Sequence, residues 1–399
     1  MTKLLDLKNN SVIAINQNNY TKEDNYKKVC YLDTDNITNN RINAFLKIDL
    51  TKEKLPSRAK RKCSINSIIY SSVRPNQRHF GIIKEIPKNF LVSTAFIVID
   101  IIDLKKLDPN YLYYYITQDK ITHYLQRIAE CGTSSYPSIT PLDFLNVKIK
   151  LYPLETQQKI ARTLSILDQK IENNHKINEL LHKILELLYE QYFVRFDFLD
   201  ENNKPYQTSG GKMKFSKELN RLIPSGWSVR FLNHKIVSTY QPKTISKTLL
   251  NNSYSYSVYG GGGIIGRFTE YNHEQSEFII SCRGQCGISY LTLPKSWITG
   301  NAMVIRPTKS YTSKTYLYHT IKKYKLTNYI TGSVQPQITR QNLSTMPILI
   351  PKRKILNKWN NISSLLWNLI HNNMQSTQTL TALRDFLLPL LLKQQVKPK

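Results

Sequence analysis

"LETQQKIARTLSILDQKIENNHKINELLHKILELLYEQY" occupies residues 154–192 and decides the architecture of this 399-residue chain. Positions 160, 164, 167, 171, 174, 178, 181, 185, 188 and 192 read I, L, L, I, N, N, L, L, L and Y. Their steps alternate between four and three residues, the spacing of a coiled-coil seam that faces a partner helix. The stretch therefore predicts a long amphipathic helix that packs against a second helix.

A second stretch with the same spacing lies near the C-terminus. Positions 355, 359, 362, 366, 369, 373, 376, 380, 383, 387 and 390 read I, W, I, L, L, N, S, L, L, L and L. Both seams turn polar in the middle, and Asn174 and Asn373 are 199 positions apart. A buried Asn in a seam costs stability but fixes register, so we expect Asn174, Asn178 and Asn373 to set an antiparallel pairing. Nearly forty residues at 1.5 Å each make a spacer of roughly 60 Å.

The segments before the two helices also repeat. "PSITPLDFL" (137–145) matches "PQITRQNL" (336–343), and Pro137 and Pro336 are again 199 positions apart. Further upstream, "SIIYSSVR" (67–74) resembles "FIISCRG" (278–284), "TAFIVI" (94–99) resembles "NAMVIR" (301–306), and "YLYYYI" (111–116) resembles "TYLYHTI" (315–321). Alternating apolar runs predict strands, and the tyrosine-rich segments predict helices.

The repeat predicts an α/β (α+β) fold of two tandem mixed globular domains, each followed by a long helix. We place the first domain at 1–153, the central spacer helix at 154–197, a polar linker at 198–223, the second domain at 224–352 and the C-terminal spacer helix at 353–395.

The charge balance points to a polyanionic partner. Lys and Arg number 56 against 28 Asp and Glu, a net charge of +28, and neutralising phosphates releases counterions. An AT-rich genome would also enrich Lys, Asn, Ile and Tyr, and this alternative stays open. The longest apolar run, "FLLPLLL" (386–392), is shorter than the roughly 20 residues that span a bilayer. No signal peptide is visible, and five cysteines without a CxxC pair are typical of a cytoplasmic protein with reduced thiols.

No catalytic motif is found in the sequence. "GGGGIIG" (260–266) satisfies GxGxxG, but no long helix follows it to hold a pyrophosphate, so a tight hairpin with close backbone approach is favoured over a dinucleotide loop. There is no HExxH, no His/Cys cluster, no adenine-methylation motif and no P-loop. We therefore expect no catalytic residue, no metal and no cofactor in this chain.

Basic and amide side chains gather instead in predicted loops. Arg pairs bidentately with guanine, and Asn or Gln with adenine, so such loops suit the reading of base edges. Contacts to phosphate alone, or simple solvation, are the alternatives for each residue. The candidate DNA-binding residues are Arg58, Lys60, Arg61, Lys62, Arg74, Asn76, Arg78, His79, Tyr259, Arg267, Arg283, Gln285, Gln335, Gln337 and Arg340.

Taken in order, several stretches resemble the specificity subunit (HsdS) of type I restriction–modification systems, most closely the type IC group. They are "YPLETQQKIARTLSILDQKI" (152–171), "YFVRFDF" (192–198), "KPYQTSGGKM" (204–213), "IPSGW" (223–227), "YSVYGGGGIIG" (256–266) and "QPQITRQNL" (335–343). "LPSRAKR" with "IIYSSVRPNQRHFG" (55–81) resembles a recurrent class of target recognition domain. Two departures are Arg195, where relatives carry an acidic residue, and the lack of an "IPSGW" before the first domain.

The resemblance implies two target recognition domains that each read one half of a bipartite double-stranded DNA site. It implies that the spacer sets the gap and docks two methyltransferase (HsdM) subunits, with motor–nuclease (HsdR) subunits joining for cleavage. S-adenosylmethionine, ATP and Mg would then bind to those partners. Alternative readings are a non-catalytic antirestriction or regulatory protein that binds the methyltransferase, or the specificity subunit of a type IIB/IIG-like system. A modification enzyme or nuclease fused to recognition domains would need a catalytic motif that is not found.

Overall fold

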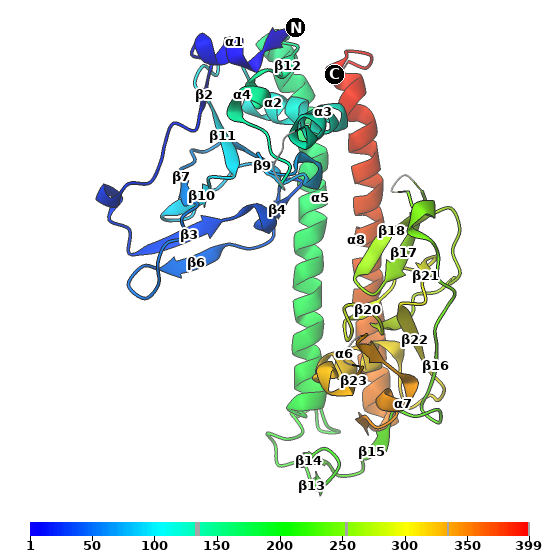
Figure 1. The fold of residues 1–399 in the computed structure, drawn as a ribbon. Helices are drawn as coiled ribbons and strands as arrows, with labels where there is room; N and C mark the ends of the chain where they lie inside the picture. The colour runs from blue at the N-terminus through cyan, green and yellow to red at the C-terminus, as the bar shows by residue number, and fades with distance from the viewer. Residues whose placement is uncertain (132–135, 252–253, 333–334, 398–399) are drawn as a thin grey trace. The chain divides into compact units, whose positions relative to one another are not determined.

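The computed structural model describes residues 1–131, 136–251, 254–332 and 335–397. The chain forms two compact units, which we call unit 1 (Met1–Asn173 with Thr377–Lys399) and unit 2 (Asn174–Ser376). Two long helices, α5 (Leu154–Tyr189) and α8 (Arg353–Leu392), each begin in one unit and end in the other (Figure 1). The unit border falls at the polar middle of both predicted seams. The domain boundaries drawn from the sequence stay a prediction.

Unit 1 is built on two four-stranded sheets with the orders β2-β11-β8-β9 and β6-β3-β10-β7. The strands of the first are β2 (Ile13–Ile15), β11 (Phe96–Ile101), β8 (Ile68–Ser71) and β9 (Phe80–Ile82). Those of the second are β6 (Leu46–Asp49), β3 (Lys28–Leu32), β10 (Phe90–Ser93) and β7 (Ala59–Arg61). Two short pairs join β1 (Thr2–Lys3) to β12 (Lys148–Ile149) and β4 (Ile37–Thr38) to β5 (Arg41–Ile42). The helices are α1 (Leu4–Asn9), α2 (Pro109–Ile116), α3 (Asp119–Glu130) and α4 (Pro141–Leu145), with 3-10 turns at η1 (Lys22–Asp24), η2 (Thr34–Asn36) and η3 (Pro75–Gln77).

Unit 2 contains a sheet of the same antiparallel order, β16-β22-β19-β20. Its strands are β16 (Val237–Tyr240), β22 (Ala302–Pro307), β19 (Phe278–Ser281) and β20 (Ser289–Leu291). A three-stranded sheet holds β18 (Gly263–Phe268), β17 (Tyr256–Gly260) and β21 (Trp297–Ile298). The short pairs are β13 (Met213–Ser216) with β14 (Arg221–Pro224), β15 (Ser228–Phe231) with β25 (Pro347–Ile350), and β23 (Ile330–Thr331) with β24 (Gln337–Ile338). The remaining helices are α6 (Lys314–Lys322), α7 (Arg340–Leu343), the π-helical turn η4 (Glu190–Val194), and the 3-10 turns η5 (Lys247–Leu249) and η6 (Leu326–Tyr329).

The predicted internal repeat is confirmed at the level of single caps. Thr140 begins α4 and Thr339 begins α7, and each hydroxyl accepts the backbone N–H of the residue three positions later, at 3.1 and 3.2 Å. Such caps satisfy amides that the first helical turn leaves without a partner. The two helices that follow the central strands are capped likewise, α2 by Asp108 and α6 by Ser313. The repeated phrase is therefore a helix start that the chain uses twice.

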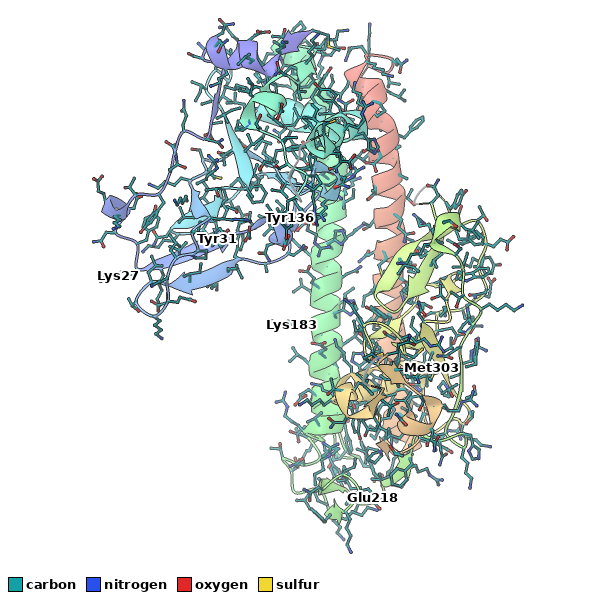
Figure 2. All side chains as sticks on the ribbon, in the orientation of Figure 1. Lys27, Tyr31, Tyr136, Lys183, Glu218 and Met303 are labelled. Carbon is teal, nitrogen blue, oxygen red and sulfur yellow. The ribbon has the colours of Figure 1, made fainter. Side chains whose placement is uncertain are left out.

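Each unit has its own apolar core, which includes parts of both long helices. In unit 1, Leu164 of α5 and Leu391 of α8 are buried in the same cluster as strand residues such as Ile68. In unit 2, the C-terminal part of α5 and the N-terminal part of α8 line the larger core. Figure 2 labels Tyr31 on β3 and Met303 on β22, which are 1% and 4% exposed. Because each helix is amphipathic, packing on these cores stabilises it far more than its own propensity does.

Within unit 2 the two long helices pair antiparallel, as the sequence predicted. Asn174 Nδ2 lies 3.4 Å from Ser376 Oγ. Asn178 Nδ2 donates to the Ile370 carbonyl at 3.3 Å, and Asn373 Nδ2 donates to Asn178 Oδ1 at 3.0 Å. The three predicted asparagines thus lie together between the helices. Their role in fixing register stays a prediction.

The predicted seam of α8 is wrong at alternate positions. Ile362 and Leu369 are 36% and 45% exposed, whereas their neighbours Ser363 and Ile370 are fully buried. The helix carries apolar residues on two adjacent faces, so periodicity alone does not select between them. Packing selects the face, since Trp367 at 6% exposure enters the core of unit 2.

The glycine run forms the predicted hairpin. Gly260 and Gly263 end β17 and begin β18, and Gly263 has φ +97°. A Cβ on Gly261 would lie 2.7 Å from the Arg283 carbonyl oxygen, so only glycine permits this backbone approach. A strand follows the turn where a dinucleotide site would need a helix, which removes the alternative reading. No helix in the described ranges is both long and apolar enough to cross a bilayer.

Candidate nucleic-acid interface

In unit 1 the connection between β8 and β9 holds four of the predicted DNA-binding residues. Arg74 has φ 46° and precedes η3, and its backbone N–H donates to the Pro137 carbonyl at 2.9 Å. Its guanidinium lies 5.4 Å from the ring centre of Tyr136, which Figure 2 labels. Asn76 is exposed, and its backbone N–H donates to Gln126 Oε1 at 3.1 Å. The loop is therefore held by its backbone, which leaves the Asn76 side chain at the surface.

Two further residues of this loop are bound to the protein itself. Arg78 forms an ion pair with Asp119 at 2.9 Å. His79 Nδ1 lies 2.5 Å from the Ile37 carbonyl oxygen, and His79 Nε2 lies 3.2 Å from Gln77 Oε1. Both side chains are partly exposed but already paired. The two side chains therefore hold the loop in shape, and their exposed parts remain at its surface.

The basic residues on and beside β7 contact the β10–β11 turn, and the loop after β8 contacts the same turn. The Thr94 N–H donates to the Arg58 carbonyl at 2.8 Å, and the Ser72 N–H donates to the Ala95 carbonyl at 2.8 Å. The short β10–β11 connection thus joins two segments that are far apart in sequence. Arg58 and Lys60 are exposed, whereas Arg61 is partly buried.

Lys62 differs from its neighbours because it has a carboxylate partner. Its ammonium lies 2.5 Å from Asp24 Oδ1, and this contact lowers the pKa of the Asp24 carboxyl. Lys62 therefore contributes less free positive charge to the surface than Arg58 or Lys60 does.

In unit 2 three segments meet at the end of β19. The β17–β18 turn abuts the Arg283 backbone, as the close approach of Gly261 shows. Arg283 forms an isolated antiparallel bridge with Gln337. Arg283, Gln285, Gln335 and Gln337 are all exposed. Unit 2 thus gathers one guanidinium and three carboxamides at one edge of its sheet.

Three other predicted residues of unit 2 are placed differently. Tyr259 is 3% exposed, and its hydroxyl accepts the Leu293 N–H at 3.0 Å, so it belongs to the core and not to the surface. Arg267 is partly buried and donates to the Ser255 carbonyl at 2.6 Å. Arg340 is exposed and donates to the Thr239 carbonyl. The two arginines are anchored to backbone carbonyls, whereas Tyr259 is part of the apolar core.

The repeat does not pair Arg74 with Arg283, although the sequence comparison matched them. The Ile139 N–H donates to the Ser72 carbonyl in unit 1, and the Ile338 N–H donates to the Cys282 carbonyl in unit 2. Ser72 therefore corresponds to Cys282, and Arg74 to Gly284. Arg74 and Gly284 both have positive φ, 46° and 74°. The two units present their arginines one position apart on the same loop.

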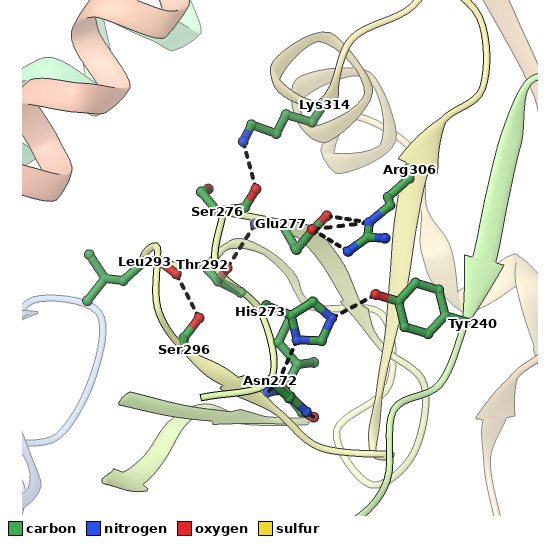
Figure 3. Close-up of polar contacts among 11 residues, drawn as sticks. Tyr240, Asn272, His273, Ser276, Glu277, Thr292, Leu293, Ser296, Arg306 and Lys314 are labelled. Atoms are coloured by element: carbon green, nitrogen blue, oxygen red, sulfur yellow. Dashed lines mark hydrogen bonds and ion pairs between the residues drawn. The ribbon is translucent and has the colours of Figure 1, made fainter. Parts of the chain in front are cut away.

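The sequence missed Gln241, which follows β16 and reaches the loop after β19 that carries Arg283. Its Nε2 lies 2.8 Å from Cys282 Sγ. The preceding Tyr240 hydroxyl donates to His273 Nε2 at 2.7 Å, because His273 Nδ1 donates to Asn272 Oδ1 at 2.5 Å (Figure 3). Burial lowers the pKa of His273, which keeps the ring neutral in this tautomer. The position of Gln241 directly after a predicted apolar strand was the available signal.

An ion pair beside this network fixes the end of β22. Arg306 holds Glu277 with both nitrogens of its fork, at 2.6 and 3.1 Å (Figure 3). Its guanidinium lies 5.2 Å from the ring centre of Tyr240. Glu277 is 8% exposed, so this pair is structural. Within the described ranges, no group of His, Cys, Asp or Glu is arranged to hold a metal ion.

The fold class of the chain is a duplicated mixed α/β unit in which a long helix follows each copy, with basic and amide side chains at one sheet edge. The family model described as "Type I restriction modification DNA specificity domain" matches residues 6–183 and again 224–382. The chain therefore belongs to the type I restriction–modification DNA specificity family.

Two relatives are similar to the chain in sequence, and one solved structure is similar to it in fold. The type I restriction enzyme HindI specificity subunit of Haemophilus influenzae is 23% identical, over 93% of this chain and 95% of its own length. The type I restriction enzyme MjaIX specificity subunit of Methanocaldococcus jannaschii is 24% identical, over 71% of this chain and 68% of its own. The crystal structure of a type I restriction-modification S subunit from M. genitalium shares the fold with TM-score 0.57 at 15% identity, over 98% and 95% of the two chains.

Proposed function

We propose that the chain reads a bipartite double-stranded DNA site, one half with each unit. One observation carries the proposal: the same loop of a repeated sheet bears different side chains in the two units. Unit 1 presents Arg74 and Asn76, and unit 2 presents Arg283 and Gln285. Arg matches guanine, and Asn or Gln matches adenine, so different loops favour different half-sites.

An exposed apolar stripe on α5 supports docking of a partner protein. Ile177, Leu180, Ile184 and Leu187 are 46%, 61%, 44% and 54% exposed, and they are spaced by three and four residues. Such a row forms one face of a helix, and exposed apolar rows mark interaction sites. On this proposal the stripe docks methyltransferase (HsdM) subunits, two in the assembled complex.

The proposal gives the chain no chemistry of its own. Methyl transfer from S-adenosylmethionine would occur on the methyltransferase subunits. ATP and Mg would serve motor–nuclease (HsdR) subunits that join for cleavage in the cytoplasm. The chain itself supplies recognition and spacing.

The test replaces one arginine in each unit and maps methylated sites in cells that also express the methyltransferase. Arg74→Ala should weaken recognition of one half-site, and Arg283→Ala the other, by about 1–3 kcal/mol for a bidentate base contact. Lys27, exposed just before β3 (Figure 2), is the control outside the candidate residues, and Lys27→Ala should leave both half-sites unchanged.

Loss at the same half-site in both variants would contradict one unit per half-site. Equal weakening on all DNA, with a shallower salt dependence, would mark these arginines as phosphate contacts.

A further inference from the structure

Arg61 is a partly buried cation without a compensating charge among the described residues. Within that part of the chain, its side chain makes one long hydrogen bond, from Nη2 to the Thr94 carbonyl at 3.5 Å. Its Nε is buried and has no hydrogen-bond partner among the described residues. No carboxylate in the described ranges pairs with it, and burial lowers the pKa of its guanidinium. Removing a charge from water without a partner costs stability, so the free protein carries this group at a loss.

Neighbouring cations in similar settings are compensated. Lys62, the next residue, has Asp24 at 2.5 Å, and Arg78 has Asp119 at 2.9 Å. Arg306, on a central strand of unit 2, has Glu277 at 2.6 Å. Arg61 differs from these three paired cations, and its guanidinium is left able to bind an anion from outside.

The position of Arg61 defines which anion it meets. It ends β7, and its contact with Thr94 puts it at the turn that also holds Arg58 and the loop after β8. These are the elements that carry the proposed DNA contacts of unit 1. The planar fork of N–H donors on a guanidinium suits a phosphate. The anion expected at such a surface is therefore a phosphate of the DNA backbone.

We infer that Arg61 is a preformed anchor for a DNA backbone phosphate, held by the fold at a cost in stability. This inference rests on the proposed DNA binding and adds one residue contact, with a backbone phosphate as its partner. A phosphate contact positions the duplex and carries no sequence information. Its loss weakens specific and non-specific binding alike.

The experiment uses the full chain and the variant Arg61→Met, which removes the charge and keeps the length of the side chain. Without DNA, the melting temperature followed by circular dichroism should stay equal or rise. On duplexes with and without the recognised site, affinity should fall about eightfold at 0.1 M salt, since each contact contributes about 0.9 to the salt slope. Arg306→Met is the matched control, and it should melt lower because Glu277 loses its partner.

A lower melting temperature for Arg61→Met, or an unchanged salt slope, overturns the inference. Sodium phosphate at constant ionic strength separates the two sources of the anion. Equal stabilisation of parent and variant is expected for a site completed by DNA, whereas stabilisation of the parent alone would mean a free-phosphate site. If the parent recognises no bipartite site, the proposed function fails, while the comparison on non-specific duplex still decides the role of Arg61.

Discussion

Acidification from pH 7.5 to 5.5 should destabilise unit 2 through histidines that are buried in neutral form. His319 on α6 and His371 on α8 are 3% and 8% exposed, and the Nε2 of each is buried without a hydrogen bond among the described residues. They pack on Trp359 and Trp367, with ring centres 5.3 and 5.8 Å apart. Neither ring has an acidic partner in the described part of the chain that would favour its charged form.

Burial, reinforced by the nearby Lys322 ammonium, lowers the pKa of His319 to about 3. Burial together with Lys314 lowers the pKa of His371 to about 4. Burial also lowers the pKa of His182 on α5, which lies beside Trp367, although Glu186 opposes the shift. The unfolded chain binds protons below about pH 6.5, whereas the folded unit does not. Stability is therefore complete above that pH and is lost as the pH falls.

The magnitude follows from the linkage of protonation to folding. Each of the two deeply buried rings contributes about 1.4 kcal/mol between pH 7.5 and 5.5, so together they lower stability by about 3 kcal/mol. With a urea slope of about 2 kcal/mol per molar, the unfolding midpoint falls by about 1.5 M. Carboxyl groups contribute little in this window, since their usual pKa is about 4.

Tryptophan fluorescence is the assay, because all four tryptophans lie in unit 2: Trp227, Trp297, Trp359 and Trp367. His319→Phe should remove about 1.4 kcal/mol of the pH dependence, since one of the two deeply buried rings is gone. His123→Asn, at an exposed position of unit 1, is the control and should change nothing. Equal midpoints at both pH values for the parent would refute the reasoning.

Three further predictions concern the two long helices and the β17–β18 turn. Asp168→Leu or Arg384→Leu alone should destabilise unit 1 by about 2–4 kcal/mol in urea unfolding, whereas the double variant should return to within about 1 kcal/mol of the parent. The reason is that these paired side chains are only 21% and 22% exposed, and a double variant as unstable as the singles would contradict it. Gly261→Ala should impair recognition of the half-site that unit 2 reads, because its Cβ would meet the Arg283 carbonyl at 2.7 Å, and normal methylation of the parental site would exclude this. Inserting one heptad near Asn174 and one near Asn373 adds about 10 Å of helix, so mapped half-sites should move apart by about three base pairs, and an active variant that keeps the parental gap would show that the helices do not set it.

Local patterns determined much of this protein from its sequence. The alternation of four and three predicted both long helices, and the repeated phrase predicted an internal repeat, which the structure confirms with threonine caps at the equivalent positions Thr140 and Thr339. The glycine run predicted a hairpin with close backbone approach. These features depend on residues within a few positions of one another, so the sequence alone is enough to find them.

The tertiary structure decided which side chains are buried, paired or exposed. Only packing selected Ile370 over Leu369 on α8 and put Tyr259 into the core. Only strand pairing showed that Arg74 corresponds to Gly284, and only the surroundings of Arg61 showed that it lacks an acid. Burial and pairing depend on segments that are distant in sequence. The identity of a charged or aromatic residue therefore does not tell whether its side chain is buried, paired or exposed.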